Sequence, residues 1–361
     1  MSIPDQTAEQ TIQIRLKQRV FYRRLILIVS GLTLLCIAIT SLCIGPANLS
    51  LGIVWKTIAA GILGKSGLVS VGTYAIIWDI RFPRVVMALI SGAALSICGL
   101  SMQGVLRNPL VSPYTLGISS GAAFGASVVI VLGNVMAGSL GEYFLIITAA
   151  FCMSLIAVGF VVFLARLRGM GAESLILSGI AVMYLFSAGT SIMQYVATKD
   201  QLAQIVFWLM GSLVSISWRE VGIGALLLSA GFPALFSLSW HINILGSGED
   251  AAKSLGTNPR LITLFVIVIS TLVTAGVVSF TGIIGFIGLV GPHIARLLLG
   301  NDHKLLFPAS ALIGAFLLTI SDTIARSLLG NTEIPIGIVT SIIGVPFFIS
   351  ILVRKRRRRV A

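Results

Sequence analysis

Long apolar runs constrain this chain more than any single motif in it. A transmembrane helix needs about 20 predominantly apolar residues to cross about 30 Å of hydrocarbon. Runs of this kind follow one another along the whole sequence, separated by short polar stretches. We therefore predict an all-α polytopic membrane protein with ten transmembrane helices. The predicted spans are 25–45, 84–106, 115–133, 143–165, 174–197, 221–240, 261–280, 283–299, 306–325 and 336–353.

The composition agrees with a membrane location. Of 361 residues, 57% are hydrophobic and 10% are charged, whereas soluble domains carry about 25% charged residues. The net charge is +13, but the basic residues lie between apolar runs and form no single patch, so we predict no nucleic-acid partner. The four cysteines lie inside apolar runs without metal-ligand spacing. We interpret them as buried free thiols and predict no metal site in this chain.

The lysines and arginines predict the orientation. Placing both ends of the chain in the cytoplasm puts eighteen of these residues inside and seven outside, in agreement with the positive-inside rule. An even number of spans also returns both ends to the same side. The predicted organisation is a cytoplasmic tail over 1–24, one transmembrane domain over 25–353 with a cytoplasmic loop at about 241–260, and a basic cytoplasmic tail over 354–361.

The stretch Gly282–Asp302 reads GIIGFIGLVGPHIARLLLGND and repeats glycine at every third position before a proline. Glycine costs a helix about 1 kcal/mol relative to alanine, and an internal proline costs about 3 kcal/mol. A helix selected only for crossing the membrane would not collect them. Two interpretations are open: a locally bendable helix, or close packing of small residues against neighbouring helices. The residues concerned are Gly285, Gly288, Gly291 and Pro292.

Arginines mark the predicted outer ends of two spans. Arg81 and Arg84 bracket Pro83, which predicts that no helix begins before the proline. Their side chains either extend to lipid headgroups or present cations to the carboxylates of an external partner. Arg326 emerges on the same side, four residues after Asp322. An internal ion pair explains these two residues as well as a docking surface does.

Two predicted inner loops are also distinctive. The loop after the second span holds Asn108 and Leu110 between two prolines, and it is either a helix-breaking turn or a gate. The loop at 241–260 begins with acidic residues and continues to a glycine, a pattern that predicts a short capped helix. This helix is either a solvated connector or a contact for a soluble partner. Its residues of interest are Glu249, Asp250, Ala251, Leu255 and Gly256.

Two further patterns help to exclude alternatives. Gly117, Gly121 and Gly125 follow one another at four-residue spacing, which predicts close packing on one face of a helix. The stretch 59–66 nearly matches a phosphate-binding loop, but Ala59 replaces its first glycine, and the preceding strand and cytosolic position are missing. If ATP drives this protein, another chain therefore hydrolyses it.

Six segments in fixed order resemble the FecCD-type permeases of bacterial and archaeal ABC importers for iron–siderophores, haem and cobalamin. The resemblance covers about residues 25–354. The segments are IRFPRVV (80–86), GAALSICGLSMQGVLRNPL (92–110), LGISSGA (116–122), GFIGLVGPHIARLLLGNDH (285–303), SDTIAR (321–326) and EIPIGIVTSIIGVPFF (333–348).

The resemblance implies a transport subunit with no catalytic residue and no cofactor of its own. The implied location is the cytoplasmic (inner) membrane of a prokaryote. The implied partners, besides lipid, are a second permease subunit (an identical chain or a paralogue), two ATPase subunits that use ATP and Mg, and a periplasmic or lipid-anchored substrate-binding protein.

The resemblance also implies roles for particular residues. Glutamates of the binding protein would meet Arg81, Arg84 and Arg326. The cytoplasmic gate would include Asn108 and Leu110, with Ala172 in a second gate region. The loop from Gly248 to Gly256 would be the coupling helix that sits in a groove of the ATPase, and Gly282–Asp302 would line the pathway.

We therefore expect the membrane-spanning subunit of a type II ABC importer that moves an iron–siderophore-type chelate by alternating access. Haem and cobalamin are the alternative cargoes. A stand-alone, ion-coupled secondary transporter is the alternative of a different class. Such carriers place ionisable groups at mid-membrane, whereas the predicted spans hold Asp322 near one end. We interpret His293 as a hydrogen-bonding group near a helix end and not as an iron ligand.

Overall fold

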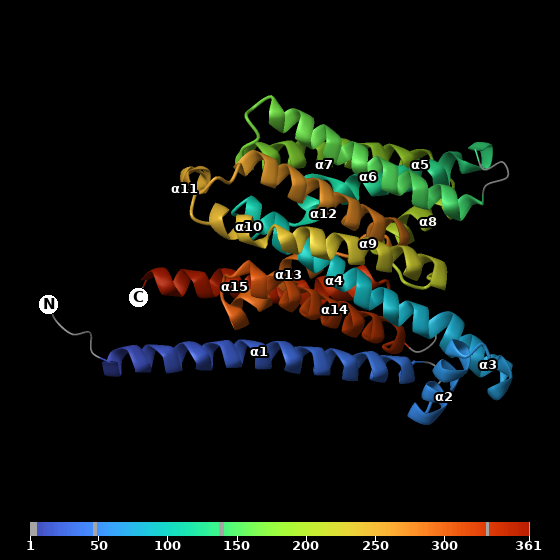
Figure 1. Cartoon of the computed structure of the whole chain (residues 1–361). Coiled ribbons are helices and arrows are strands. Elements are labelled where there is room, and N and C mark those ends of the chain that lie inside the picture. Colours follow the sequence, from blue (N-terminus) through green and yellow to red (C-terminus); the bar gives the residue numbers. More distant parts are fainter. Residues whose placement is uncertain (1–5, 46–48, 137–140, 330–331, 361) are drawn as a thin grey trace.

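The computed structural model describes residues 6–45, 49–136, 141–329 and 332–360, and every regular element in these ranges is a helix (Figure 1). In lipid, a helix satisfies its backbone hydrogen bonds within one segment, so apolar runs of this length fold as helices. The elements in chain order are α1 (Gln6–Cys43), α2 (Leu51–Ile62), η1 (Ser66–Leu68), α3 (Val71–Tyr74), η2 (Ala75–Arg81), α4 (Phe82–Val105), η3 (Pro113–Leu116), α5 (Ile118–Met136), α6 (Glu142–Arg166), α7 (Ala172–Val196), α8 (Lys199–Met210), α9 (Trp218–Ser237), α10 (Ser239–Leu245), α11 (Glu249–Ser254), α12 (Pro259–Thr281), α13 (Ile287–Leu299), α14 (His303–Ser327) and α15 (Ile336–Val360).

The predicted spans coincide with helices of the bundle. In the described part of the chain, 7 helices are long and apolar enough to cross a membrane. The remaining predicted spans fall on shorter apolar helices, at Ile118–Gly133, Ile287–Leu299 and Ile336–Ile349. The all-α polytopic membrane fold is confirmed, and the count of ten spans stays a prediction.

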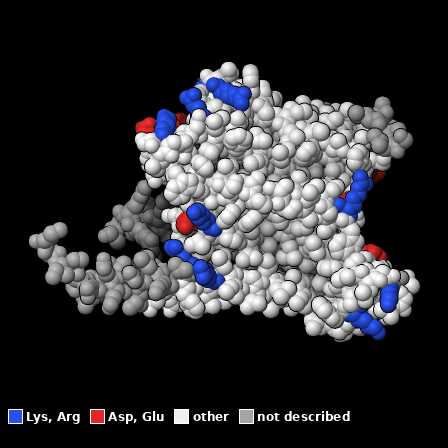
Figure 2. All heavy atoms as spheres, in the orientation of Figure 1, with Lys and Arg blue, Asp and Glu red and all other residues white. Residues whose placement is uncertain are grey.

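The bundle has two ends that carry the connections between helices. The first residues of α1, the last residues of α15 and helices α10 and α11 lie at one end, which we call the α11 end (Figure 1). Helices α2 and α3 lie at the opposite end, the α2 end. On the face seen in Figure 2, lysine and arginine gather toward these ends and the middle is uncharged. The lysines and arginines of the sequence predicted that the first residues of α1, the last residues of α15 and the loop at 241–260 share one side of the membrane, and the structure places them at one end. Which side of the membrane each end faces stays a prediction.

Helix α4 lies in the centre of the bundle and is buried along most of its length. Helices α9, α12, α13 and α14 all pack against it. Two of these contacts are between backbones, because a Cβ atom on Gly99 would lie 1.9 Å from the carbonyl oxygen of Gly288, and one on Gly92 would lie 2.3 Å from that of Gly314. Small residues at such crossings allow the close approach that drives helix association in membranes.

The predicted packing role of the four-residue glycine pattern holds for two of its three members. Gly121 and Gly125 face the backbone of α6, where added Cβ atoms would lie 2.6 Å from the Met153 carbonyl oxygen and 2.4 Å from that of Ala149. Gly117 instead precedes α5 with a φ of 81°, a left-handed conformation that ends η3.

The prediction that no helix begins before Pro83 is wrong. The π-helical element η2 runs directly into α4, and Pro83 lies in the first turn of that α-helix. Proline is tolerated in a first turn because the N–H that it lacks has no partner within that α-helix. Arg81 and Arg84 therefore project from one continuous helical segment.

The predicted span 283–299 includes four residues that are not helical. Helix α12 ends before Gly282, whose φ of 66° is left-handed, and α13 begins only at Ile287. A left-handed glycine directly after a helix terminates it. Gly285 therefore lies in the connection and not in the predicted pathway helix, which contains Gly288 and Gly291.

Within α13, a side chain from α4 supports the helix at its internal proline. Pro292 has no N–H to donate to the carbonyl group of Gly288, four residues earlier. Gln103 Nε2 donates to that carbonyl oxygen at 3.2 Å, and Arg296 donates to Gln103 Oε1. We call this arrangement the Gln103 bridge. Gly288 and Gly291 also face α4, so the structure favours the packing interpretation for these two glycines.

The contact between Gly99 and Gly288 yields a stability prediction. We expect Gly99→Ala to lower the thermal unfolding temperature of the purified protein, because the added methyl group overlaps the Gly288 carbonyl and overpacking costs about 1–3 kcal/mol. The matched control is Gly159→Ala, since Gly159 is also helical but a methyl group added there would have no neighbour within 4 Å. Equal unfolding temperatures for the two variants would contradict the backbone contact.

Candidate functional site

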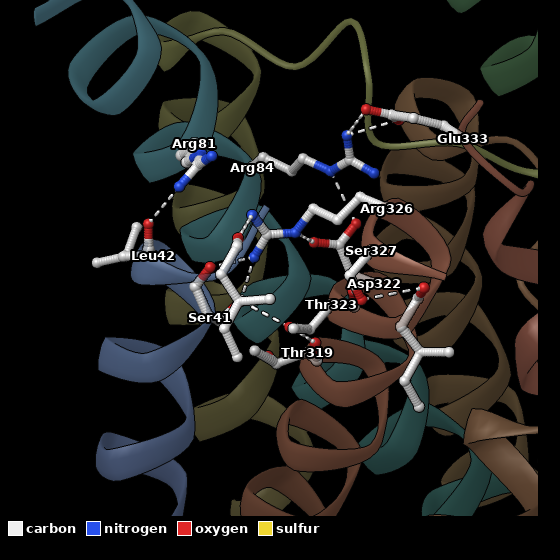
Figure 3. A network of polar contacts seen from close by, with 12 residues as sticks. Ser41, Leu42, Arg81, Arg84, Thr319, Asp322, Thr323, Arg326, Ser327 and Glu333 are labelled. Carbon is white, nitrogen blue, oxygen red and sulfur yellow. Dashed lines mark hydrogen bonds and ion pairs between the residues drawn. The ribbon is translucent and has the colours of Figure 1, made fainter. Parts of the chain in front are cut away.

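The three predicted docking arginines come together at the α2 end, although they belong to different elements. Arg81 ends η2, Arg84 lies in the first turn of α4, and Arg326 lies in the last turn of α14. Asp322 and Glu333 complete the group (Figure 3). We call these five residues the arginine cluster.

Arg84 is the centre of the arginine cluster. Its Nε donates to Asp322 Oδ1 at 2.8 Å. Its Nη1 donates to both carboxylate oxygens of Glu333, at 3.0 and 2.8 Å. The Arg84 side chain is 5% exposed and that of Asp322 is fully buried, whereas the Glu333 side chain is 41% exposed. Glu333 is thus the member of this trio that solvent reaches.

The other two arginines hold the end of α1. Arg81 Nη1 donates to the carbonyl oxygens of Leu42 and Cys43, at 3.0 and 3.2 Å. Arg326 donates to the carbonyl oxygens of Ile44, at 2.9 Å, and of Ser41. The last carbonyls of a helix have no intrahelical N–H partner and carry partial negative charge, so cations stabilise them. These two guanidinium groups therefore join the end of α1 to η2 and to α14.

The internal pair predicted between Asp322 and Arg326 is present. Arg326 Nε lies 3.4 Å from Asp322 Oδ2, with both side chains buried. All three arginines are at most 5% exposed. Their guanidinium groups bind groups of this chain and are not held outward at the surface, so the docking role stays a prediction that requires the cluster to open.

Sequence reasoning missed Glu333, which begins the sixth of the resembling segments. Its only signal was its position directly before the last predicted span, on the same predicted side as the three arginines. Position along the chain gives no distance to Arg84, so the pairing follows only from the fold.

The predicted gate residues occupy a tight turn at the α11 end. Asn108 Oδ1 accepts a hydrogen bond from the backbone N–H of Leu110 at 3.0 Å. This Asx turn fixes the loop after α4. Leu110 is half exposed, so the turn presents an apolar side chain at this end of the protein.

The short predicted helix is present as α11. Glu249 and Asp250 form its first turn, and Gly256, with a φ of 75°, follows its end. Glu249 Oε1 accepts from Arg107 Nη2 at 2.8 Å, which ties α11 to the loop that carries the gate residues. Asp250, Ala251 and Leu255 are exposed.

A cleft of about 490 Å³ unites the predicted second gate region with α11. Ala172, at the start of α7, lines this cleft together with Glu249 and Gly256. The end of α4 and the start of α12 complete its walls. The structure therefore brings together, at one end of the bundle, the residues that the sequence analysis assigned to the gate and to coupling.

Within the described ranges, no three His, Cys, Asp or Glu side chains lie close enough together to hold a metal ion. His293 lies within α13 and meets the Phe347 ring edge-on, with 5.8 Å between the ring centroids.

Comparison with known proteins gives a consistent result. The sequence model of the FecCD transport family matches residues 32–354. The hemin transport system permease of Yersinia pestis is 35% identical over 328 residues, which cover 90% of this chain and 94% of that protein. The molybdate import system permease of Haemophilus influenzae is 36% identical over 337 residues, covering 92% and 96%. A solved inward-facing structure of a metal-chelate type ABC transporter has a TM-score of 0.79 at 34% identity and covers 91% of this chain and 99% of that chain.

The charge balance of the arginine cluster yields a second prediction. We expect Asp322→Asn to lower the free energy of unfolding by about 3–5 kcal/mol, because it leaves buried guanidinium groups without their counter-charge. Glu333→Gln is the matched control, and it should cost only about 1 kcal/mol, because the amide keeps an oxygen acceptor for Arg84 and Asp322 remains as the counter-charge. Thermal unfolding of both variants in the same lipid nanodiscs measures the difference. Similar losses would show that Asp322 is not the essential counter-charge.

Proposed function

The chain belongs to the FecCD transport family, and we propose that it moves a metal chelate across the cytoplasmic membrane by alternating access. It is a multi-pass transport subunit of a type II ABC importer, and ATP hydrolysis belongs to separate ATPase subunits. A second permease subunit completes the pathway in this proposal. A substrate-binding protein delivers the cargo to the α2 end.

The observation that carries the proposal is the contact between the gate loop and α11. The Arg107–Glu249 ion pair joins the loop that follows the central helix α4 to the short helix α11, which is exposed at every residue except Ala252. An ATPase that binds and shifts α11 would therefore pull directly on the gate loop. Such a partner changes the conformational equilibrium only through its different affinity for the two states.

The proposed cargo is a chelated metal, with an iron–siderophore complex as the first candidate and haem or cobalamin as alternatives. Sequence identity does not separate the cargoes, because the hemin and molybdate permeases are 35% and 36% identical to this chain. In this proposal the binding protein selects the chelate, so the permease carries whichever chelate its binding protein delivers.

The competing function is a stand-alone secondary transporter coupled to an ion gradient. Such carriers use ionisable groups near the middle of the membrane. In α14 the acidic residue is Asp322, which lies near the end of the helix and is paired with Arg84 and Arg326. This pairing supports a structural role for the carboxylate and counts against a coupling role.

Reconstitution distinguishes the two functions. In liposomes that contain this permease, its ATPase and its binding protein, we expect uptake of the chelate that requires ATP on the side of the membrane where the ATPase lies. Uptake driven by an ion gradient in liposomes that contain this chain alone would reject the ABC importer proposal.

The ion pair between the gate loop and α11 yields a third prediction. We expect Arg107→Glu and Glu249→Arg each to lower the amount of cargo moved per ATP by about two- to fivefold, because a half-exposed ion pair contributes at most about 1 kcal/mol. The charge-swapped double variant should recover most of this loss. Transport and ATP hydrolysis are measured together in the same liposomes. Additive losses in the double variant would show that the two residues act independently.

A further inference from the structure

We infer that Glu333 is an internal substitute for a carboxylate of an external acidic protein, and that it covers Arg84 until that protein displaces it. The inference rests on the docking role proposed for the arginine cluster and names the residue that regulates it. Glu333 would act as a removable cover, while Asp322 stays in place as the permanent counter-charge.

The two carboxylates of the cluster differ in how they are held. Asp322 is fully buried and lies between Arg84, at 2.8 Å, and Arg326, at 3.4 Å. Glu333 is 41% exposed and, among the described residues, takes its hydrogen bonds from Arg84 alone. Removing Asp322 would disrupt two arginines, whereas moving Glu333 would release only Arg84 Nη1 (Figure 3).

The position of Glu333 also sets the direction from which a partner must come. The Arg84 side chain is 5% exposed, and Glu333 is the more exposed of the two carboxylates that pair with it. A carboxylate that approaches from solvent therefore meets Glu333 first. Because a guanidinium prefers two-bond pairing with a carboxylate, an incoming glutamate or aspartate could take the same place on Arg84.

Exchange of one carboxylate for another is favoured over simple opening. If Glu333 turned away alone, Arg84 Nη1 would lose both oxygens of its acceptor inside a largely buried site, which is costly for a charged donor. An incoming carboxylate restores those hydrogen bonds. The cluster is then selective for acidic surfaces, since a neutral surface cannot replace the lost charge.

The backbone around Glu333 confines the required movement to its side chain. The next residue is fixed, because the Ile334 N–H donates to the Ala325 carbonyl oxygen at 3.0 Å. Two residues further on, the Ile336 N–H donates to the Gly211 carbonyl oxygen at 3.1 Å. A rotamer change at Glu333 leaves both bonds intact, and exposed side chains change rotamer within nanoseconds.

Chemical labelling tests the cover directly in the full-length protein in lipid nanodiscs. Phenylglyoxal modifies accessible arginines, and mass spectrometry reports its rate at each position. We expect labelling of Arg84 to be several-fold faster in Glu333→Gln than in the natural chain, and faster still in Glu333→Ala. Glu249→Gln is the matched control, because it neutralises a half-exposed, arginine-paired glutamate at the opposite end.

Two internal controls separate uncovering from unfolding. Arg326 belongs to the same cluster but binds α1, so its labelling should stay slow in both Glu333 variants. Exposed Arg260 should be labelled equally in all proteins. If Arg84 is labelled at the same rate with and without Glu333, or if Arg326 speeds up together with it, the proposed cover is rejected.

A soluble peptide tests carboxylate exchange without any binding protein. Hexaglutamate should slow the labelling of Arg84 in Glu333→Ala, and hexaserine should not. Faster labelling without protection by hexaglutamate would reject the exchange.

The docking role is tested separately, by the affinity of the assembled importer for its binding protein. Arg84→Lys keeps the charge but loses the two-bond geometry, so it should weaken docking. Unchanged affinity in that variant would reject the docking proposal, and it would leave the labelling result for Glu333 as it stands.

Discussion

The burial of α4 is the constraint on which the other features of this protein depend. Because helices pack around this segment on several sides, the charged and amide side chains that it carries bind partners inside the protein. Arg84, at one end, pairs with Asp322, and Gln103, near the other end, binds α13. The loop that follows α4 continues to Arg107 and its ion pair with Glu249. One buried helix thus connects the arginine cluster with the cleft at the α11 end.

The helices could be predicted from the sequence because their causes are local. The length of an apolar run and the residues at its ends act within one segment, and each of the ten predicted spans overlaps a helix over most of its length. The errors arose where two local rules competed. Pro83 was taken as a barrier, although a π-helical element precedes it. The run 283–299 was taken as one helix because its first residues are as apolar as the rest, whereas Gly282 begins a non-helical connection.

The candidate site was predictable only in part, for a related reason. The pair Asp322–Arg326 and the short helix α11 are set by spacing within a helix, and both were found. The partners of Arg84 and Arg107 lie far along the chain, at Glu333 and Glu249, 249 and 142 positions away. No spacing rule relates such residues, because their contact depends on how the whole bundle packs. Their predicted placement on a common side of the membrane was the only information that the sequence offered.

The Gln103 bridge has a consequence for how this protein can vary over evolutionary time. The amide of Gln103 is needed at the Gly288 carbonyl only because Pro292 supplies no N–H there. A residue with an N–H at position 292 could donate to the Gly288 carbonyl itself. The residue at position 103 would then no longer need to supply that hydrogen bond. The proline on α13 and the glutamine on α4 are therefore energetically coupled, and a change at either position alters which residues are acceptable at the other.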